Sequence, residues 1–443
     1  MGSKLSSLPD KVKAFNTYFQ SVYTREETHS LPCLQKELKN YRSMESICDI
    51  VIDEDDVYEA LCCIDPSKSC GPDEIAGRLL KEGAPWLSTP LTKLFNLSLK
   101  MSVLPSDWTS ANITPVHKKG SRHDPRNYRP ISLTSISVKI LERLIHRKIM
   151  NFLNHHNKLS SHQHGFRTAH SCQTQLLESV HHWAQSLDKR SSTHIFFLDF
   201  SKAFDSVPHE HLLIKLDCIG VRGAVLKWIR SFLTDMRQRV MLEGCTSTWA
   251  PVTSGVPQGS ILGPLLFLVY INDIDTQLSS HVKLFADDCA IYNQVSCKAD
   301  TSSLQSDLNS LYTWCVKWQL NLNLPKCKAL CISNKRSPPN STYYINNVPL
   351  EWVSEFTYLG VKITSNLSWR GHILAKTTKA NRTLNLLRRT MYSCGEGAKK
   401  RAYEALVRPQ VEYCSAVWNP HLKKDVDVLE KLQRRAARWI CCR

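Results

Sequence analysis

Two short apolar segments that run directly into aspartates constrain this chain more than any other feature. Residues 195–198 (IFFL) have the composition of a buried strand, and Asp199 follows them. Residues 282–292 are expected to form two strands around a turn that contains Asp287 and Asp288. A carboxylate in apolar surroundings is costly unless its charge is compensated, and a metal ion compensates it. A helix cap or an ordinary hairpin turn explains either site alone, but the combination favours a metal site.

Carboxylates held in this way suit the two-metal transfer of a nucleotide to a growing strand. One divalent ion lowers the pKa of the attacking hydroxyl, and the other holds the triphosphate and stabilises the leaving oxygen. Mg²⁺ prefers oxygen ligands and retains waters, so a few carboxylates suffice when rigid elements hold them. The expected cofactor is therefore a pair of Mg²⁺ ions, with Mn²⁺ as the alternative.

The charge of the chain indicates a polyanionic partner. Its 443 residues include 57 Lys and Arg against 40 Asp and Glu, which gives a formal net charge of +17. Residues 371–443 contain 16 of these basic residues and 6 of the acidic ones, so 10 of the 17 net charges lie there. A solvated helix face explains one basic helix, whereas this concentration favours contact with a nucleic-acid backbone. Composition alone leaves an anionic membrane surface open.

No segment has the length of a membrane span, and no membrane partner is expected. The longest apolar run, residues 261–271, is too short to cross a bilayer and contains Gly263 and Pro264, so a buried helix is predicted there. The 17 cysteines include no C-x-x-C pair that would indicate a zinc site. They are expected to be reduced thiols that fill the core.

Hydrophobic periodicity predicts mixed α and β structure. The first hundred residues are expected to be mostly helical, residues 304–320 to form a long amphipathic helix, and residues 343–363 to form short strands. Beyond residue 371 the pattern is helical. The stretch 429–438 places basic side chains near one helix face and leaves apolar ones for packing. The basic residues are Lys431, Arg434, Arg435 and Arg438, and the apolar ones are Leu429, Leu432, Ala436 and Trp439.

Nine stretches, taken in chain order, carry a resemblance to a known family. They are 68–73 (KSCGPD), 113–120 (ITPVHKKG), 127–133 (NYRPISL), 163–167 (QHGFR), 198–205 (LDFSKAFD), 255–260 (GVPQGS), 285–288 (FADD), 323–326 (NLPK) and 358–360 (YLG). Together they resemble the reverse transcriptase of non-long-terminal-repeat retrotransposons, the long interspersed elements, and most of all its jockey-like members. A lone Ala-Asp-Asp is weak evidence, but an ordered series over nearly the whole chain is specific.

The resemblance implies an α+β right-hand polymerase fold with fingers, a palm of antiparallel sheet plus helices, and a helical thumb. Residues 1–97 are then an N-terminal helical extension leading into the fingers. Residues 98–363 are the reverse transcriptase domain of fingers and palm, and residues 364–443 are a basic helical thumb or connection region, truncated at its end. The implied function is RNA-directed DNA polymerase, which extends a DNA primer on an RNA template with dNTPs.

The resemblance also implies the catalytic residues. Asp199 and Asp287 are expected to be the principal metal ligands, with Asp288 beside them. Lys326 matches a lysine that acts as general acid toward the pyrophosphate, although an exposed loop lysine explains it equally well.

Further positions are implied to bind the incoming nucleotide. Arg129 suits the triphosphate because a guanidinium grips phosphate through two parallel hydrogen bonds. Lys118 or Lys119 supplies a second charge, and the sequence does not choose between them. Gln258 and Gly259 match a loop that touches the nucleotide, where glycine permits close backbone approach.

The start of the palm motif adds two aromatic positions. The backbone carbonyl of Phe200 is expected to join the metal coordination. Phe204 lies where the family places an aromatic ring under the sugar, which would clash with a 2′-hydroxyl and favour deoxynucleotides; a core aromatic is the alternative. Asp205 is expected to be a structural hydrogen-bonding residue. The resemblance also implies that Tyr358, Leu359 and Gly360 position the primer end.

Two expectations concern what the sequence lacks and what else it could encode. Family members carry an endonuclease before the polymerase, and none is expected here, so the chain is interpreted as a fragment of an element. The alternative function is a catalytically silent nucleic-acid-binding remnant of such a polymerase. A maturase-like splicing cofactor fits less well, because those relatives have a tyrosine before the aspartate pair where this chain has Phe285 and Ala286. The nucleus is the expected location if the protein acts in retrotransposition.

Overall fold

A computed structural model describes residues 7–27, 29, 31–38, 42–335 and 341–441. The chain divides between two units, and each unit draws on three separate stretches of sequence. Unit 1 comprises Met1–Ser161, Phe200–Thr276 and Thr313–Asn321, and unit 2 comprises His162–Asp199, Gln277–Tyr312 and Leu322–Arg443. Both contain helices and sheet, as the periodicity predicted. The three segments inferred from the family resemblance stay a prediction, and their residues 1–6, 28, 30, 39–41, 336–340 and 442–443 lie outside the described part.

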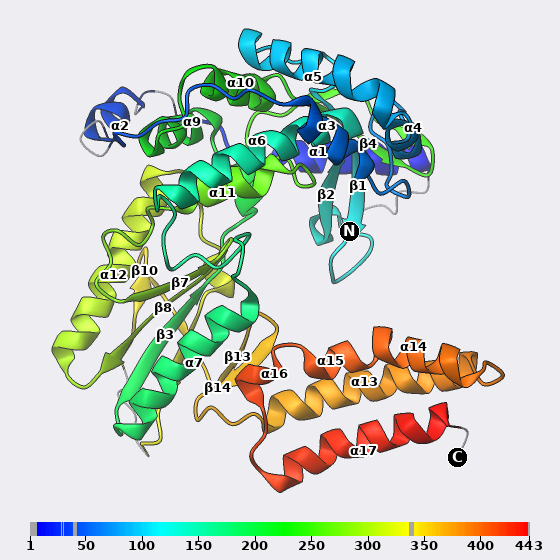
Figure 1. Ribbon diagram of the computed structural model, residues 1–443. Coiled ribbons are helices and arrows are strands. Elements are labelled where there is room, and N and C mark those ends of the chain that lie inside the picture. The colour runs from blue at the N-terminus through cyan, green and yellow to red at the C-terminus, as the bar shows by residue number, and fades with distance from the viewer. Residues whose placement is uncertain (1–6, 28, 30, 39–41, 336–340, 442–443) are drawn as a thin grey trace. The chain divides into compact units, whose positions relative to one another are not determined.

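Helices dominate unit 1, and the mostly helical character predicted for the first hundred residues is confirmed (Figure 1). The helices before the first strand are α1 (Leu8–Ser21), α2 (Leu31–Leu38), α3 (Glu54–Cys62), α4 (Gly77–Glu82) and α5 (Ala84–Met101). Those that follow in the same unit are α6 (Ile136–His155), α8 (Ala203–Ser206), α9 (His209–Ile219), α10 (Gly223–Thr234) and α11 (Leu262–Ile271).

The sheet of unit 1 is built around a long β-hairpin. Its order is β2 (Tyr128–Leu133), β1 (Ser110–His117), β4 (Arg237–Leu242) and β5 (Cys245–Thr246), while β6 (Ala250–Pro251) also pairs with β4. Strands β1 and β2 run antiparallel, and β1 and β4 run parallel. The segment that joins β1 to β2 includes a 3₁₀ turn at Pro125–Asn127.

The predicted buried helix at residues 261–271 is confirmed as α11, whose residues are all buried except Pro264. Its start is capped by a glutamate from α6. The backbone N–H groups of Ile261 and Leu262 donate to Glu142 Oε2 at 2.7 and 3.0 Å, which pairs donors that a helix start leaves without internal partners. Glu142 is fully buried, and its burial raises the pKa of the carboxyl to about 7.

Unit 2 is centred on a five-stranded sheet. Its order is β12 (Glu351–Val353), β9 (Lys328–Ile332), β3 (Ser192–Leu198), β8 (Asp288–Val295) and β7 (His281–Phe285). Neighbouring strands are antiparallel except β12 and β9, which are parallel. The strands predicted at residues 195–198 and 282–292 are therefore confirmed and lie side by side. Helix α7 (Cys172–Asp188) packs along β3 and β7 (Figure 1).

The helix predicted at residues 304–320 is α12 (Lys298–Lys317), which begins in unit 2 and ends in unit 1. The short strands predicted at residues 343–363 are also present in unit 2. They form the hairpins β10 (Tyr344–Ile345) with β11 (Val348–Pro349) and β13 (Glu355–Tyr358) with β14 (Val361–Thr364).

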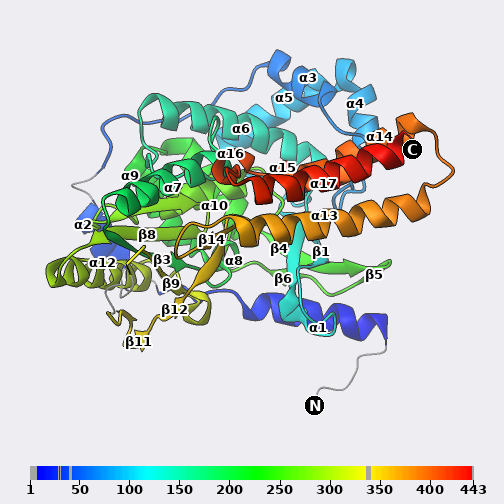
Figure 2. The same cartoon turned by 90° about the horizontal axis from the view of Figure 1, so that it is seen from below.

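The chain after residue 371 is helical, as predicted. Its helices are α13 (Arg370–Thr390), α14 (Glu396–Leu406), α15 (Arg408–Glu412), α16 (Ser415–Trp418) and α17 (Lys423–Ile440). Helices α13 and α17 lie side by side (Figure 2), around a small apolar core. On α17, the predicted packing residues Leu432 and Ala436 are buried, and the four predicted basic side chains are exposed.

Two further findings concern the described residues only. No helix among them is long and apolar enough to cross a membrane. Their cysteines all carry free thiols.

The buried carboxyl of Glu142 predicts a pH dependence of stability. Because its folded-state pKa of about 7 exceeds the ordinary value of 4.5, the folded protein binds this proton more tightly than the unfolded chain. The resulting stabilisation is complete below pH 4.5 and is lost as the pH rises through 7. Relative to Glu142→Gln, wild-type protein should lose on the order of 3 kcal/mol of unfolding free energy across this range.

Urea denaturation of both proteins at pH 4.5, 6 and 7.5 measures the difference. The exposed Glu59 of α3 gives a control variant, Glu59→Gln, in which a carboxylate is lost without any buried proton. Parallel pH profiles for wild type and Glu142→Gln would contradict the prediction.

Candidate active site

The register of β3 against β8 brings the two predicted acidic sites to one end of the sheet. Leu198 pairs with Cys289 at the end of an antiparallel ladder. Asp199 directly follows the last residue of β3, and Asp288 is the first residue of β8. The two aspartates therefore lie at the same end of these neighbouring strands. Antiparallel pairing makes this unavoidable, because the carboxyl end of one strand meets the amino end of its neighbour. Asp199 is half-buried and Asp288 is exposed.

Asp287 lies in a two-residue turn that joins β7 to β8. Phe285 pairs with Asp288, which leaves Ala286 and Asp287 as the central residues. Ala286 has a φ of +53° and the φ of Asp287 is not positive, and a positive φ at the first central residue alone is the feature of a type II′ hairpin turn. For a residue with a Cβ atom this conformation costs about 1 kcal/mol, so neighbouring contacts must hold it.

A contact that the sequence reasoning missed supports this turn. Gln163 Oε1 accepts a hydrogen bond from the backbone N–H of Ala286 at 2.9 Å. Residues 163–167 counted toward the family resemblance, but no role was inferred for them. The only signal was their place in the ordered series, because the two partners are 123 residues apart in sequence.

Lys326 lies beside Asp199. Its Nζ is 2.7 Å from Asp199 Oδ2, in an ion pair whose two side chains are partly exposed. The backbone N–H of Asn323 donates to the carbonyl oxygen of Asp199 at 2.7 Å, and the 3₁₀ turn Leu324–Lys326 follows at once. The predicted general acid and the predicted metal ligand therefore belong to one local cluster, in which the ammonium offsets the charge of the carboxylate.

No group of three or more His, Cys, Asp or Glu side chains is arranged to hold a metal ion within the described part of the chain. The aspartates at the sheet edge nevertheless supply the hard oxygen donors that Mg²⁺ prefers. The chemical type of these ligands, carboxylate oxygen, therefore fits the expected Mg²⁺ ions.

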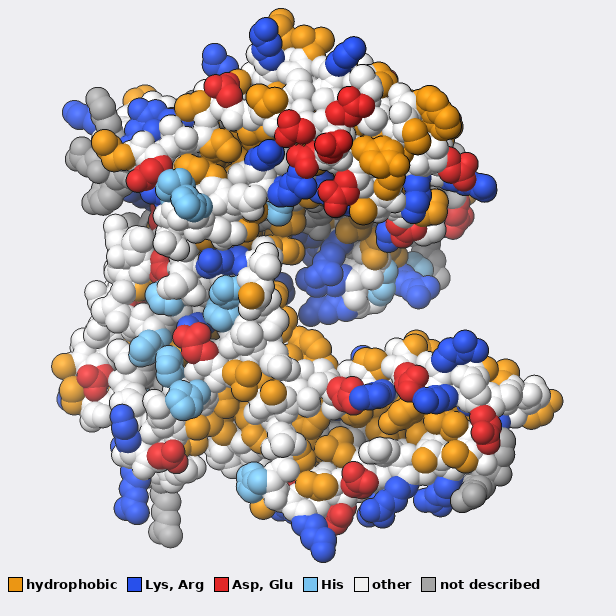
Figure 3. All heavy atoms as spheres, in the orientation of Figure 1, with side chains coloured by type: hydrophobic (Ala, Val, Ile, Leu, Met, Phe, Trp, Pro, Cys, Tyr) orange, Lys and Arg blue, Asp and Glu red, His pale blue; other side chains and the backbone are white. Residues whose placement is uncertain are grey.

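The residues predicted to contact the nucleotide lie in unit 1, on the β1–β2 hairpin, in the loop at Gln258 and Gly259, and at Phe200 and Phe204. The first of these places is the β1–β2 hairpin, where Lys118 and Lys119 follow β1 and Arg129 lies on β2, all exposed. The backbone N–H of Lys118 donates to the carbonyl oxygen of Asn127 at 2.8 Å, which extends the hairpin by one more bond. Lys and Arg side chains gather around the end of this hairpin (Figure 3). Such a cluster attracts phosphate.

The second place is the loop that contains Gln258 and Gly259. Gln258 Nε2 donates to Asp205 Oδ1 at 2.7 Å, and the Gln258 carbonyl oxygen accepts from the N–H of Ser132 at 2.7 Å. Gly259 has a φ of +120°, and a Cβ atom there would lie 2.6 Å from the carbonyl oxygen of Ser132. The hydrogen bond to Asp205 agrees with the structural role expected for that residue, whose burial raises the pKa of the carboxyl to about 6.

Phe200 and Phe204 also lie in unit 1. Phe200 is buried, and Phe204 is half-buried and stacks on Phe267 with ring centroids 4.5 Å apart. This stacking fixes the plane of the Phe204 ring and leaves part of the residue exposed. Both the sugar-contact role and the core role remain compatible with that geometry.

The predicted primer-binding segment lies in unit 2, at the β13–β14 hairpin. Tyr358 is only 3% exposed, and its hydroxyl accepts a hydrogen bond from Gln175 of α7, so its ring belongs to the core. Leu359 and Gly360 form the turn with positive φ values of 44° and 79°. Tyr413 donates to the Leu359 carbonyl oxygen at 2.9 Å. The accessible part of this segment is therefore the turn rather than the tyrosine.

Comparison with known proteins identifies the family to which this sequence is similar. The family model described as "Reverse transcriptase (RNA-dependent DNA polymerase)" matches residues 116–363. The "Probable RNA-directed DNA polymerase from transposon BS" of Drosophila melanogaster is 29% identical over 438 residues, which cover 96% of this chain and 48% of that protein. The "RNA-directed DNA polymerase from mobile element jockey" of Drosophila funebris is 29% identical, covering 95% and 47%. The chain thus spans about half the length of these curated relatives.

The loop at Gly259 predicts a large effect of a single methyl group. Gly259→Ala should lower the unfolding free energy by roughly 2–4 kcal/mol, because it combines an unfavourable φ with a clash against backbone. Gly244 has a φ of +80° with open space around it, so Gly244→Ala should cost only about 1 kcal/mol. Urea denaturation of the two variants separates the clash from the backbone strain. Equal losses would show that the approach to Ser132 is not tight.

Proposed function

Because the chain belongs to the reverse transcriptase (RNA-dependent DNA polymerase) family, we propose that it is a retrotransposon polymerase that extends a DNA primer on an RNA template. The observation that carries the proposal is the placement of Asp199 and the Asp287–Asp288 turn at one edge of the unit 2 sheet. Two-metal nucleotidyl transfer needs carboxylates gathered at one point, and this placement supports the proposal. The proposal concerns a chain that spans about half of its curated relatives.

Asp199, Asp287 and Asp288 would hold two Mg²⁺ ions, or Mn²⁺ in their place. When bound, the ions supply activation of the primer hydroxyl and neutralisation of charge on the triphosphate. Lys326, which contacts Asp199, donates a proton to the leaving pyrophosphate. A lysine at this point also limits the repulsion between the carboxylates before substrate arrives.

The nucleotide would be held by residues of unit 1. Arg129 grips the triphosphate, and Lys118 or Lys119 on the same exposed hairpin adds a point charge. The Gln258–Gly259 loop would contact the nucleotide, and the close approach of Gly259 to the Ser132 carbonyl oxygen holds the loop in place. The carbonyl of Phe200 would join the metal ligands, and the ring of Phe204 would contact the sugar.

A right-hand arrangement assigns these parts to fingers, palm and thumb. The β1–β2 hairpin belongs to the fingers, the five-stranded sheet of unit 2 to the palm, and helices α13 to α17 to the thumb. The exposed basic residues of α17 would contact the phosphate backbone of the RNA template and DNA primer. The Leu359–Gly360 turn would position the primer end, supported from beneath by the buried Tyr358.

Primer extension on poly(rA)·oligo(dT) with Mg²⁺ and dTTP tests the function. Wild-type protein should extend the primer, and Asp287→Ala should reduce the rate by about 10³-fold or more, because a metal ligand is lost. Asp188, an exposed residue at the end of α7, provides the control variant Asp188→Ala, which should extend normally.

Full activity of Asp287→Ala would exclude the proposed metal site. Absence of extension by every variant, together with duplex binding that weakens steeply with salt, would instead identify a silent nucleic-acid-binding protein.

Discrimination between sugars tests Phe204. Replacing the ring with a smaller side chain should let a 2′-hydroxyl enter, so Phe204→Ala should lower the ratio of kcat/KM for dTTP over UTP by about tenfold or more. Phe95→Leu, which alters a fully buried ring of α5, controls for general loss of packing. If Phe204 were only a core residue, thermal stability would fall and the ratio would stay at the wild-type value.

A further inference from the structure

Residues 162–165 run along β7 and extend the edge of the unit 2 sheet. The backbone N–H of His164 donates to the Leu284 carbonyl oxygen at 2.8 Å, and the N–H of Leu284 donates to the His162 carbonyl oxygen at 3.0 Å. Gln163 forms a parallel bridge with Leu284. This short segment is therefore held in register with the strand that leads into the Ala286–Asp287 turn.

The side chain of Gln163 reaches from this segment to the turn. Its Oε1 accepts two backbone hydrogen bonds, from Gly165 at 2.7 Å and from Ala286 at 2.9 Å. Two N–H donors at one atom identify that atom as the amide oxygen. Gln163 is 2% exposed, so water does not compete for these bonds. One buried amide thus ties the turn to the segment beside it.

Gly165 makes this contact possible. A Cβ atom at this position would lie 2.3 Å from the backbone nitrogen of Ala286, which is closer than any side chain allows. The backbone of residue 165 therefore lies directly against the turn. Any larger residue would have to push the turn or the segment away.

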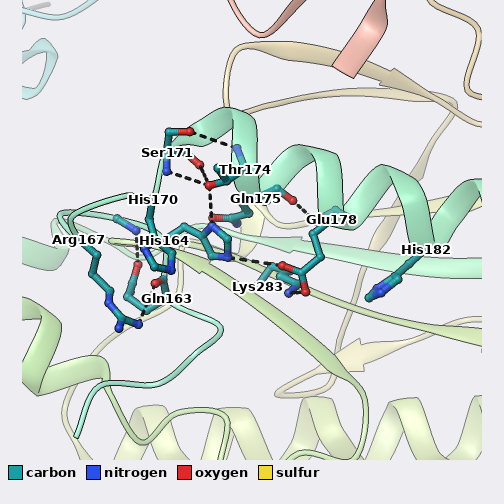
Figure 4. Close-up of polar contacts among 12 residues, drawn as sticks. Gln163, His164, Arg167, His170, Ser171, Thr174, Gln175, Glu178, His182 and Lys283 are labelled. Carbon is teal, nitrogen blue, oxygen red and sulfur yellow. Dashed lines mark hydrogen bonds and ion pairs between the residues drawn. The ribbon is translucent and has the colours of Figure 1, made fainter. Parts of the chain in front are cut away.

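His164 anchors the other side of the segment to α7 (Figure 4). Its Nδ1 is 3.0 Å from the hydroxyl of Thr174, which belongs to the capping box of α7, and its Nε2 is 3.6 Å from Glu178 Oε2. Glu178 also forms an ion pair with Lys283 of β7. Burial, with the nearby His170, lowers the pKa of His164 to about 4, so the ring is neutral at physiological pH. The segment is thus fixed both to a helix and to the strand.

We propose that Gln163 and Gly165 are positioning residues that fix the Ala286–Asp287–Asp288 turn, and that His164 holds them in place. The effect of this positioning on catalysis rests on the function proposed above. Mg²⁺ requires near-ideal octahedral geometry, so small displacements of Asp287 and Asp288 relative to Asp199 weaken its binding. The residues act through the turn and do not themselves touch the ions.

Two variants of Gln163 separate the acceptor from the volume of the side chain. Gln163→Met keeps a similar length but removes the acceptor, whereas Gln163→Glu keeps an acceptor oxygen. Hydrogen exchange at the Ala286 amide should become about tenfold or more faster in Gln163→Met and stay slow in Gln163→Glu. Mn²⁺ binding to the substrate-free protein, followed by electron paramagnetic resonance, should weaken by about tenfold in Gln163→Met. In primer extension, kcat should fall while KM for dTTP changes little.

A matched pair of histidine variants controls for the loss of a buried polar side chain. His194 lies on β3 toward the end away from Asp199; it is buried, with Nδ1 2.8 Å from the Tyr343 hydroxyl, and burial also lowers its pKa to about 4. His164→Phe should accelerate exchange at Ala286, and His194→Phe should not, even if both variants are destabilised.

The outcomes distinguish this inference from the proposed function. Slow exchange at Ala286 and wild-type Mn²⁺ binding in Gln163→Met would overturn the inference, whether or not the protein extends primers. Fast exchange and weakened Mn²⁺ binding would support it even if wild-type protein proved inactive in extension. A general loss of exchange protection across β3 and α7 in Gln163→Met would also overturn it, because the role would then be structural support of the whole unit.

Discussion

The antiparallel ladder between β3 and β8 is the interaction on which the candidate site depends. Backbone hydrogen bonds from Ser192↔Val295 to Leu198↔Cys289 fix which residues leave the sheet together. A shift of one residue would turn every side chain of β3 to the opposite face and separate Asp199 from the turn. The buried side chains of Ile195, Phe197 and Tyr292 oppose such a shift, because they belong to the core that α7 covers.

Once the strands are in register, the cost of gathering negative charge must be offset locally. Lys326 does so for Asp199 through a direct ion pair. At the turn the local cost is backbone strain instead, and Gln163 and Gly165 contact the backbone of Ala286, whose φ is positive. Different residues thus offset the charge of Asp199 and support the backbone of the turn. Each arrives from a segment distant in sequence from the aspartate that it supports.

In unit 1, a glycine and several hydrogen bonds fix the conformation of the Gln258–Gly259 loop. Gly259 lets its loop lie against Ser132, while Gln258 bonds to Asp205. Glu142 then caps α11, which begins at Leu262, shortly after that loop. The loop is consequently held at both ends by buried polar contacts. Such contacts are directional, so they specify one loop conformation where apolar packing alone would permit several.

Periodicity and residue type were sufficient for the strands at residues 195–198 and 282–292, the buried helix α11 and the amphipathic α17, because local patterns decide which face is apolar. Residue type also identified Asp199, Asp287 and Asp288 as candidate ligands, because a carboxylate beside a buried strand is costly unless its charge is compensated. Only the tertiary structure decided that Tyr358 is a core residue, that Lys326 pairs with Asp199, and that Gln163 supports the turn. Those contacts depend on strand register and on atoms more than a hundred residues apart, which no local pattern encodes.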